Sequence, residues 1–295
     1  MQIPTYPGSR ELDLGDKKLF DGVFSETKPE ICEYTFANLF AWRQMYNFSV
    51  SAFEEFILLK SGKGNAASFF EPVGKGDKKG VITKIMRETG MQFTFVSEDT
   101  KKLFEEVPDI SISSDPANSD YVYSSKDLIG LKGKKYDGKR NFIKRYRSAN
   151  LYNYVVLNGD SARNCVAFAE EWCKYRDCEG IESLKFESLA VKEMLENFSA
   201  LGLSGAAIEI KNKICSMAIG ENLNTDTFVV HILKAKDGIT GLNQTMHNEF
   251  LSKEAAGFKF VNLEQDLGLE GLRKSKQSYH PLKLINKYIL SPKKE

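Results

Sequence analysis

The runs AAIEI (206–210), ICSMAIG (214–220) and TFVVHIL (227–233) are short apolar segments in quick succession. Polar turn residues separate them, with Lys-Asn-Lys at 211–213 and Asn-Thr-Asp at 224–226. Short apolar runs bounded by turn formers are typical of strands, and connections this short predict hairpins. We therefore expect an antiparallel meander here, and this meander decides the fold.

The segments around the meander extend it into a complete α/β unit. Downstream, the loop KDGITG (236–241) opens a helix to about residue 255, and FKFVNL (258–263) predicts the next strand. The other elements predicted in this half are a strand at 153–157, helices from Ser161 through EEWCKYR, at 184–200 and at 269–279, and a final strand at 281–290. The order β-α-α-β-β-β-α-β-α-β matches the acetyltransferase-type fold, in which a βαβ crossover follows the meander.

The first half repeats much of this order, without a residue-level repeat. Its predicted helices lie around 16–24, 33–46, 81–89 and 98–106, and its predicted strands at 47–51, 53–60, 67–73, 92–96 and 120–125. We therefore predict an α/β (α+β) chain of tandem acetyltransferase-like (GNAT-type) domains, each a mixed, mostly antiparallel sheet flanked by helices. The predicted boundaries are 1–128 for the first domain, 129–150 for a basic joint segment and helix, and 151–295 for the second domain.

Composition narrows the class of protein. The formal net charge of the 295 residues is +1, which excludes a global field that attracts nucleic acid or anionic membranes. Five cysteines without a CxxC pair and only three histidines show no zinc-site spacing, so we expect no metal. Cys165 and Cys173 share one predicted helix and are expected to be small buried thiols. Because the N-terminus lacks an apolar signal core and no stretch approaches about 18 apolar residues, we expect a cytoplasmic protein without an integral membrane segment.

A dense basic segment precedes the second half. On a helix through 139–149, Arg140, Lys144 and Arg147 fall at i, i+4 and i+7 and share one face. One interpretation is the solvated face of an amphipathic helix. The other is a clamp for phosphate or carboxylate groups, in which Arg140 offers a planar bidentate fork.

A second basic group lies near the C-terminus. Arg273 and Lys276 fall at i, i+3 on the predicted helix 269–279, and Tyr279 follows at its end. The alternative is again a helix face, whose long side chains cover apolar surface. If the two basic groups converge, they form a cationic cleft suited to a polyphosphate or an RNA terminus.

Acidic residues cluster just past the predicted strand 258–263, at Glu264, Asp266 and Glu270. Loops at strand ends are where α/β folds place sites, and a carboxylate there is suited to orient an attacking amine or to accept its proton. The alternatives are pairing with a neighbouring arginine and capping of the next helix by Asp266. His231, in the middle of an apolar strand, is typical of a hydrogen-bonded core histidine, and Trp172 is a candidate to line a pocket.

Several long motifs resemble one bacterial family. YVYSSKDLIGLKGKKYDGKRNFIKRYR (121–147), EEWCK (170–174), NLEQDLGLEGLRKSKQSYHP (262–281) and ANLFAWRQMYN (37–47) together resemble the C-terminal catalytic domain of phosphatidylglycerol lysyltransferases. The resemblance covers nearly the whole chain. It implies tandem acetyltransferase-like domains, a plan shared with Fem-type aminoacyltransferases, which pass an aminoacyl group from tRNA to an amine or hydroxyl. By position, Lys139, Arg140 and Asn141 match the family's basic-Asn motif, and Arg273, Lys276 and Tyr279 match its closing motif.

We therefore expect an acyl or aminoacyl transferase whose co-substrate is aminoacyl-tRNA or acyl-CoA, with tRNA as a partner and a small molecule, peptide or lipid headgroup as acceptor. The expected substrate-binding residues are Lys139, Arg140, Asn141, Lys144, Arg273 and Lys276, and the expected catalytic residues are Glu264, Asp266 and Tyr279. One alternative is a coenzyme A-dependent N-acetyltransferase that uses the loop 236–241, although this loop departs from the glycine-rich pyrophosphate pattern. Another is a non-catalytic RNA or ligand-binding module on the same fold.

Overall fold

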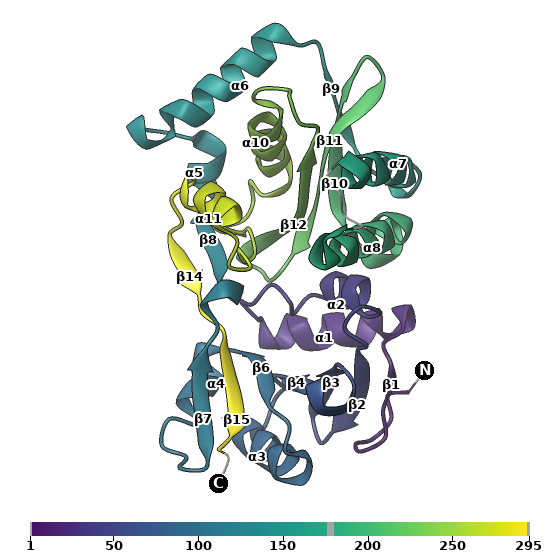
Figure 1. Cartoon of the computed structure of the whole chain (residues 1–295), viewed down its shortest axis with the longest axis vertical. Helices are drawn as coiled ribbons and strands as arrows, with labels where there is room; N and C mark the ends of the chain where they lie inside the picture. The colour runs from purple at the N-terminus through teal and green to yellow at the C-terminus, as the bar shows by residue number, and fades with distance from the viewer. Residues whose placement is uncertain (1, 176–179, 294–295) are drawn as a thin grey trace. The chain divides into compact units, whose positions relative to one another are not determined.

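The chain forms two compact units in the computed structural model, which describes residues 2–175 and 180–293 (Figure 1). The first unit comprises Met1–Asp120, Gln265–Leu272 and Leu284–Glu295, and the second comprises Tyr121–Glu264 and Arg273–Lys283. Each unit contains one mixed sheet flanked by helices, as predicted.

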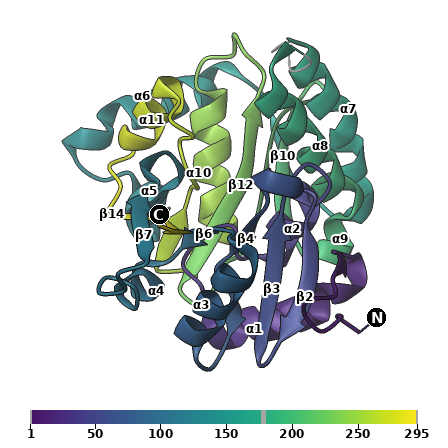
Figure 2. The same ribbon diagram turned by 60° about the horizontal axis from the view of Figure 1, so that its bottom comes forward.

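The first sheet has the strand order β1-β2-β3-β4-β6-β15-β7, with β5 paired to β3. Figure 2 labels its strands β2, β3, β4, β6 and β7. Its strands are β1 (Arg10–Glu11), β2 (Ser49–Phe53), β3 (Phe56–Ser61), β4 (Ser68–Phe70), β5 (Val73–Gly74), β6 (Phe93–Val96), β7 (Ile110–Ser114) and β15 (Tyr288–Pro292). The helices of this unit are α1 (Lys17–Thr27), α2 (Phe36–Trp42), α3 (Lys78–Thr89) and α4 (Glu98–Lys102). Helix α3 buries an apolar stripe that includes Ile82 and Ile85 in the same core as Phe93, which is the usual way in which an amphipathic helix covers a sheet.

The second sheet has the order β14-β8-β13-β12-β11-β10-β9. Its strands are β8 (Asp120–Ser124), β9 (Asn153–Val156), β10 (Ser204–Ile210), β11 (Lys213–Asn222), β12 (Thr227–Ala235), β13 (Phe260–Asn262) and β14 (Lys283–Ile285). The accompanying helices are α5 (Ser125–Gly130), α6 (Asp137–Ala149), α7 (Gly159–Tyr175), α8 (Glu182–Glu196), α9 (Phe198–Leu201), α10 (Leu242–Glu254) and α11 (Glu270–Gln277).

The predicted meander is present in the second sheet. Strands β10, β11 and β12 pair antiparallel in sequence, and α10 then leads to β13, which pairs parallel with β12. The β10–β11 turn needs positive φ at two positions, and Lys211 and Asn212 supply φ values of 50° and 60°. Helix α10 buries Met246 and Phe250 in the same core as Phe228 of β12. The order of elements that defines the acetyltransferase-type half is therefore confirmed.

Two strand assignments need correction. The strand predicted to close the first half is β8, which pairs with β13 in the second sheet. The single strand predicted at 281–290 is divided into β14, in the second sheet, and β15, in the first. β15 lies between β6 and β7 and pairs antiparallel with both, so it joins these two strands in one sheet. The predicted boundaries follow the chain linearly, whereas the two units exchange segments.

A buried charged cluster lies in the first unit, where the chain leads into β15. The Lys287 ammonium is 2.5 Å from Glu33 Oε2, 2.7 Å from Asp120 Oδ1 and 3.7 Å from Cys32 Sγ. Burial alone lowers the pKa of Lys287, but Asp120, Cys32 and Glu33 outweigh it and raise that pKa above its ordinary value. The thiol and carboxylate set is one that a metal ion can use, yet the cation that contacts all three groups here is the Lys287 ammonium.

The cysteines and the helix lengths can be compared with the expectations of buried thiols and of no integral membrane segment. Cys32, Cys165 and Cys215 are buried and form no disulfide, whereas Cys173 is disulfide-bonded, which corrects the expected thiol there. Cys178 lies outside the described residues. Among the helices of the described chain, none is both long and apolar enough to cross a bilayer.

Candidate functional site

Helix α6 and the segment after α11 meet within the second unit. Lys139 Nζ donates a hydrogen bond to Ser278 Oγ at 2.7 Å and lies 3.9 Å from the centroid of the Tyr279 ring. The Tyr136 hydroxyl donates to the Tyr279 carbonyl oxygen at 3.1 Å. The structure therefore brings together one member of each predicted basic motif.

Tyr279 belongs to a packed cluster of rings. Its ring centroid lies 4.8 Å from that of His247, and burial raises the pKa of its phenol above the ordinary value. Burial also lowers the pKa of Lys139, and burial together with the Lys139 charge lowers the pKa of His247 to about 4. Tyr279 and His247 are both uncharged near neutral pH. Tyr279 is therefore better suited to a neutral hydrogen bond than to proton transfer.

Arg140 is turned toward the loop that precedes its own helix. Its guanidinium donates to the carbonyl oxygens of Leu131 and Gly133 and pairs with Asp137. Leu131 has a φ of 45°, which is uncommon for a residue other than glycine, and the hydrogen bond to its carbonyl oxygen stabilises that conformation. Gly133 has a φ of 90°, which glycine adopts readily. Asn141, the next residue, is exposed.

The basic face of α6 lines a groove of about 490 Å³. Its lining consists of Arg140, Lys144, Arg147, Ser148, Asn248, Ile143 and residues 129–131. Arg147 pairs with Glu249 at 3.0 Å, whereas the Lys144 ammonium has no hydrogen-bond or ion-pair partner within residues 2–175 and 180–293. The face predicted from helical spacing therefore borders a concave surface and keeps at least one cation available to a ligand.

The closing motif lies apart from this groove. Lys276 Nζ donates to the carbonyl oxygen of Leu263, and the Tyr123 hydroxyl donates to the Lys276 carbonyl oxygen at 2.8 Å. Arg273 is exposed on α11, and neither Arg273 nor Lys276 is among the residues that line the groove. That the two basic groups form a single clamp stays a prediction. Lys139 meets the closing motif, while Arg140 and Lys144 face the groove.

His231 bridges two carboxylates in the second sheet. Its Nδ1 atom lies 2.7 Å from Glu264 Oε1, and its Nε2 atom lies 2.9 Å from Glu221 Oε1. Burial by itself lowers the pKa of His231, but the hydrogen bonds and charges of Glu221 and Glu264 outweigh burial and raise the pKa to about 10. His231 is thus a hydrogen-bonded core histidine, as predicted. It is an imidazolium near neutral pH, which excludes it as a general base.

The raised pKa of His231 predicts a loss of stability at alkaline pH. A histidine with an unfolded pKa of about 6.5 gives its full stabilisation below that pH and loses it as the pH rises through the folded value of about 10. The free energy of unfolding of the natural chain should therefore exceed that of a His231→Asn variant most clearly near pH 6, and the difference should shrink toward pH 10. Urea unfolding at several pH values measures this difference. A difference that does not depend on pH would contradict the double pairing.

The two acidic candidates have different surroundings. Glu264 follows β13 with a φ of 58°, and its backbone N–H donates to Asn262 Oδ1 at 2.7 Å. Its side chain is 20% exposed and is fixed by His231. Asp266 is only 2% exposed, and its Oδ1 atom accepts the Gly268 N–H at 2.8 Å, which stabilises the turn before α11. Glu264 is therefore the better placed of the two to contact an acceptor.

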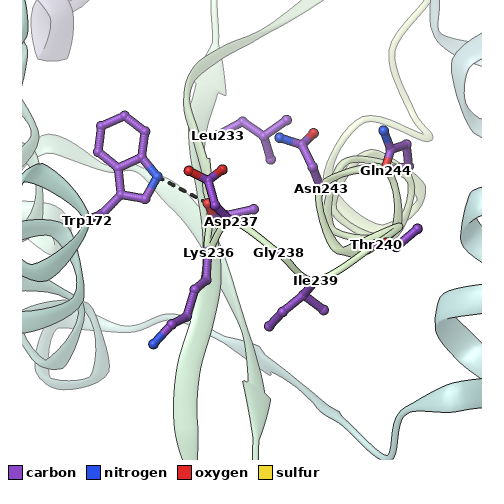
Figure 3. Close-up of a pocket in the computed structure, with 10 residues that line it drawn as sticks. Trp172, Leu233, Lys236, Asp237, Gly238, Ile239, Thr240, Asn243 and Gln244 are labelled. Atoms are coloured by element: carbon purple, nitrogen blue, oxygen red, sulfur yellow. Dashed lines mark hydrogen bonds between the residues drawn. The ribbon is translucent and has the colours of Figure 1, made fainter. Parts of the chain in front are cut away.

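A second cavity, of about 250 Å³, lies at the loop between β12 and α10 (Figure 3). It is lined by Trp172, Leu233, Ala235, Asn243, Gln244 and residues 236–240. Trp172 Nε1 donates to the Ala235 carbonyl oxygen at 3.1 Å, the dashed line in Figure 3. The prediction that Trp172 lines a pocket is confirmed.

The loop beside this cavity fits a pyrophosphate group poorly. Gly241 has a φ of 84°, and a Cβ atom there would lie 2.3 Å from the Phe142 carbonyl oxygen, so the glycine faces α6. Lys236 lines the cavity but pairs with Glu171 at 3.2 Å. Anion binding at a helix start depends on accessible N–H groups and is favoured by nearby cations. The geometry therefore agrees with the departure of this loop from the coenzyme A pattern.

The pairing of His231 with Glu221 was not predicted. The register of β11 against β12 places Glu221 opposite Val229, two residues before the histidine, and the parallel strand β13 ends just before Glu264. The signal in the sequence is a histidine inside an apolar strand, with acidic residues that follow two other predicted strands. Only the order of strands in the sheet makes those strands neighbours of β12.

Comparison with known proteins gives one family. Residues 24–291 match the family described as phosphatidylglycerol lysyltransferase, C-terminal. No curated protein matches the chain. A conserved protein of unknown function from Bacteroides thetaiotaomicron is 31% identical, with a TM-score of 0.91, over 99% of this chain and 100% of its own.

More distant structures share the fold. L-PGS from Bacillus licheniformis is 12% identical with a TM-score of 0.68, over 100% of this chain and 95% of its own. FemX is 7% identical with a TM-score of 0.52, over 96% of each chain. At such identities the likeness concerns the fold alone, and it confirms the predicted Fem-type, acetyltransferase-like architecture.

Proposed function

Because this chain belongs to the family of the C-terminal part of phosphatidylglycerol lysyltransferases, we propose that it is a transferase that moves an aminoacyl or acyl group from an activated ester to an amine or hydroxyl acceptor. The donor that we favour is aminoacyl-tRNA, which places the reaction in the cytoplasm. The observation that carries this choice is the groove on α6, where Arg140, Lys144 and Arg147 line one concave surface. Arg140 and Arg147 also have acidic partners, Asp137 and Glu249, so Lys144 is the cation that we propose for a phosphate of the RNA end. The acceptor is a small molecule, a peptide or a lipid headgroup.

The reaction needs little covalent chemistry from the protein. The acceptor nitrogen or oxygen bonds to the ester carbonyl carbon, the ester oxygen leaves with the tRNA, and the acceptor proton passes to a base. Glu264, held by His231, is the base that we propose. Positioning of an already activated ester supplies much of the rate, and no covalent enzyme intermediate is required.

Lys144→Ala is expected to weaken donor binding about tenfold or more, because a charge-assisted contact to phosphate contributes about 1.5–3 kcal/mol. The plot of log affinity against log salt should also become shallower by about 0.7 for each lost phosphate contact. Binding of aminoacyl-tRNA at several salt concentrations measures both effects. Arg145→Ala is the matched control, since Arg145 is exposed on the same helix but is not among the groove residues. Equal losses in the two variants would contradict a specific groove.

The function itself is tested by transfer of a labelled amino acid. The purified chain is incubated with labelled aminoacyl-tRNA and pools of amine, peptide and lipid acceptors, and label in the acceptor fraction is counted. Label that stays on tRNA with every pool, although tRNA binds, would favour a non-catalytic RNA-binding module instead.

A second candidate is a coenzyme A-dependent N-acetyltransferase that uses the cavity at residues 236–240, although the loop beside this cavity departs from the coenzyme A pattern. The cavity lies at the start of α10, where a helix N-terminus favours an anion. Stabilisation by acetyl-CoA in a thermal-shift assay, together with none by aminoacyl-tRNA, would favour this candidate over the first.

A further inference from the structure

The cavity at the start of α10 combines an indole ring with neutral polar side chains (Figure 3). Trp172, Leu233 and Ile239 supply apolar surface, and Asn243 and Gln244 supply carboxamides. Within residues 2–175 and 180–293, neither carboxamide has a hydrogen-bond partner. An apolar hollow with a few polar groups that can bond to a ligand is the usual form of a small-molecule site.

Trp172 is fixed in place by two contacts. Its Nε1 atom donates to the Ala235 carbonyl oxygen at 3.1 Å, and the Lys234 ammonium lies 3.7 Å from the centroid of its ring. The cavity volume of about 250 Å³ is below the range of about 300–1,000 Å³ that is usual for drug-sized ligands. A rigid apolar wall and a small volume suit a single planar ring system, which loses little conformational entropy when it binds.

The charges around the cavity disfavour an anionic ligand. Lys236 is the cation among the described lining residues and pairs with Glu171 at 3.2 Å, while Asp237 adds a carboxylate. Guanine is usually recognised by arginine or lysine. Asparagine and glutamine instead present a donor beside an acceptor, which matches the amino group and ring nitrogen of adenine. The lining therefore fits an uncharged base, and it fits adenine better than guanine.

The cavity and the groove on α6 both include residues of α10. Gln244 lines the cavity and Asn248 lines the groove, four residues further along the helix. Side chains at i and i+4 lie on the same helix face, about 6 Å apart along the axis. The two sites are therefore neighbours, as the base and the phosphates at one end of a nucleic-acid strand require.

We propose that this cavity binds an adenine ring, with Asn243 and Gln244 at the edge of the base and the apolar side chains against its faces. The inference rests on the proposed transferase function for the source of the base. Both candidate donors supply adenine, since tRNA ends in a 3′ adenosine and coenzyme A contains an adenosine unit. The adenine ring is therefore the shared ligand chemistry of the two donors.

Tryptophan fluorescence of the full chain tests the proposal. The chain has two tryptophans, so a Trp42→Phe background leaves Trp172 as the single indole. This background is titrated with adenosine, guanosine, cytidine and uridine. Adenosine should bind about tenfold more tightly than guanosine, and Gln244→Leu and Asn243→Leu should each weaken adenosine binding about tenfold. Asn164→Leu is the matched control, because Asn164 is exposed on α7 but does not line the cavity, and adenosine binding should be unchanged.

Competition with adenosine identifies the source of the base. The competitors are intact tRNA, tRNA from which the 3′ adenosine has been removed, and coenzyme A. If removal of the 3′ adenosine weakens tRNA binding about tenfold, and Gln244→Leu abolishes this difference, the cavity binds the RNA end. Competition by coenzyme A, with equal binding of the two tRNAs, would assign the adenine to coenzyme A.

Three results would overturn the proposal: equal binding of the four nucleosides, unchanged adenosine binding in both carboxamide variants, or competition by neither tRNA nor coenzyme A. Failure of the adenine site can be distinguished from failure of the proposed function. Transfer of a labelled amino acid without a preference for adenosine would contradict the adenine site alone. Adenosine binding without transfer to any acceptor would contradict the transferase alone.

Discussion

Replacement of Lys287 by methionine is expected to lower the free energy of unfolding by about 3–5 kcal/mol. The Lys287 ammonium is fully buried and lies 2.5 Å from Glu33 and 2.7 Å from Asp120. The side chains of Glu33 and Asp120 are 10% and 0% exposed, so little water can take the place of the ammonium. Methionine keeps much of the side-chain volume, so the loss reports the missing charge more than a cavity. Urea unfolding followed by circular dichroism measures the change.

Two further variants separate the charge effect from other causes. Lys293→Met removes an exposed lysine from the same C-terminal segment and should change stability by less than about 0.5 kcal/mol. Adding Glu33→Gln and Asp120→Asn to Lys287→Met removes the unpaired charges and should recover part of the loss. Burial and Asp120, opposed by Lys287, raise the pKa of Glu33 to about 7, so the effect of Lys287→Met should grow as the pH rises above neutrality. A loss below about 1 kcal/mol would mean that bound protons can replace the ammonium.

Glu264→Gln is expected to reduce the rate of transfer by about 10²–10⁴-fold, the usual contribution of a general base. Glutamine has the same shape and can still accept a hydrogen bond from His231, so the fold should be retained. The expected decrease is in kcat, with donor binding unchanged, because Glu264 is proposed to act on the acceptor. Single-turnover transfer from labelled aminoacyl-tRNA, alongside tRNA binding, measures the two separately.

Glu221→Gln is the matched control for this prediction. Glu221 binds the other nitrogen of the same imidazolium, at 2.9 Å, so the same substitution there perturbs His231 without removing the proposed base. We expect a much smaller decrease in the transfer rate for Glu221→Gln. An equal decrease in both variants would indicate that Glu264 acts only through His231, and the proposed base would have to be sought elsewhere.

The parts of the fold that local sequence controls were predicted well. The β10–β12 meander depends on hairpin turns whose residues are adjacent in the chain, such as Lys211 and Asn212. Helix α6 begins at Asp137, and its basic face follows from helical spacing. Strand β7 was not predicted, because its sequence Ile-Ser-Ile-Ser-Ser is short and rich in serine, and its pairing with β15 joins segments far apart in the chain.

The candidate site was likewise predicted only in those parts that depend on local sequence. Helical periodicity placed Arg140 and Lys144 on one face, and the structure shows that this face lines a groove. Helical periodicity could not show that Arg140 also donates a hydrogen bond to Leu131 in the preceding loop, because the spacing of charged residues does not predict a loop conformation with positive φ. Nor could it show which of Glu264 and Asp266 is buried in a turn, since both follow the same strand.

By itself, the sequence determined the order of elements around the meander at 206–233, the motifs of the family and the positions of the cations on α6. These features depend on contacts between near neighbours, which alternation and helical period record directly. Only the tertiary structure decided that β8 and β15 exchange sheets, that Lys287 is buried between Glu33 and Asp120, and that His231 joins Glu221 to Glu264. The physical reason is that the pattern of a strand specifies which face is buried but not which distant strand lies beside it. That choice depends on the burial and charge pairing of the whole chain.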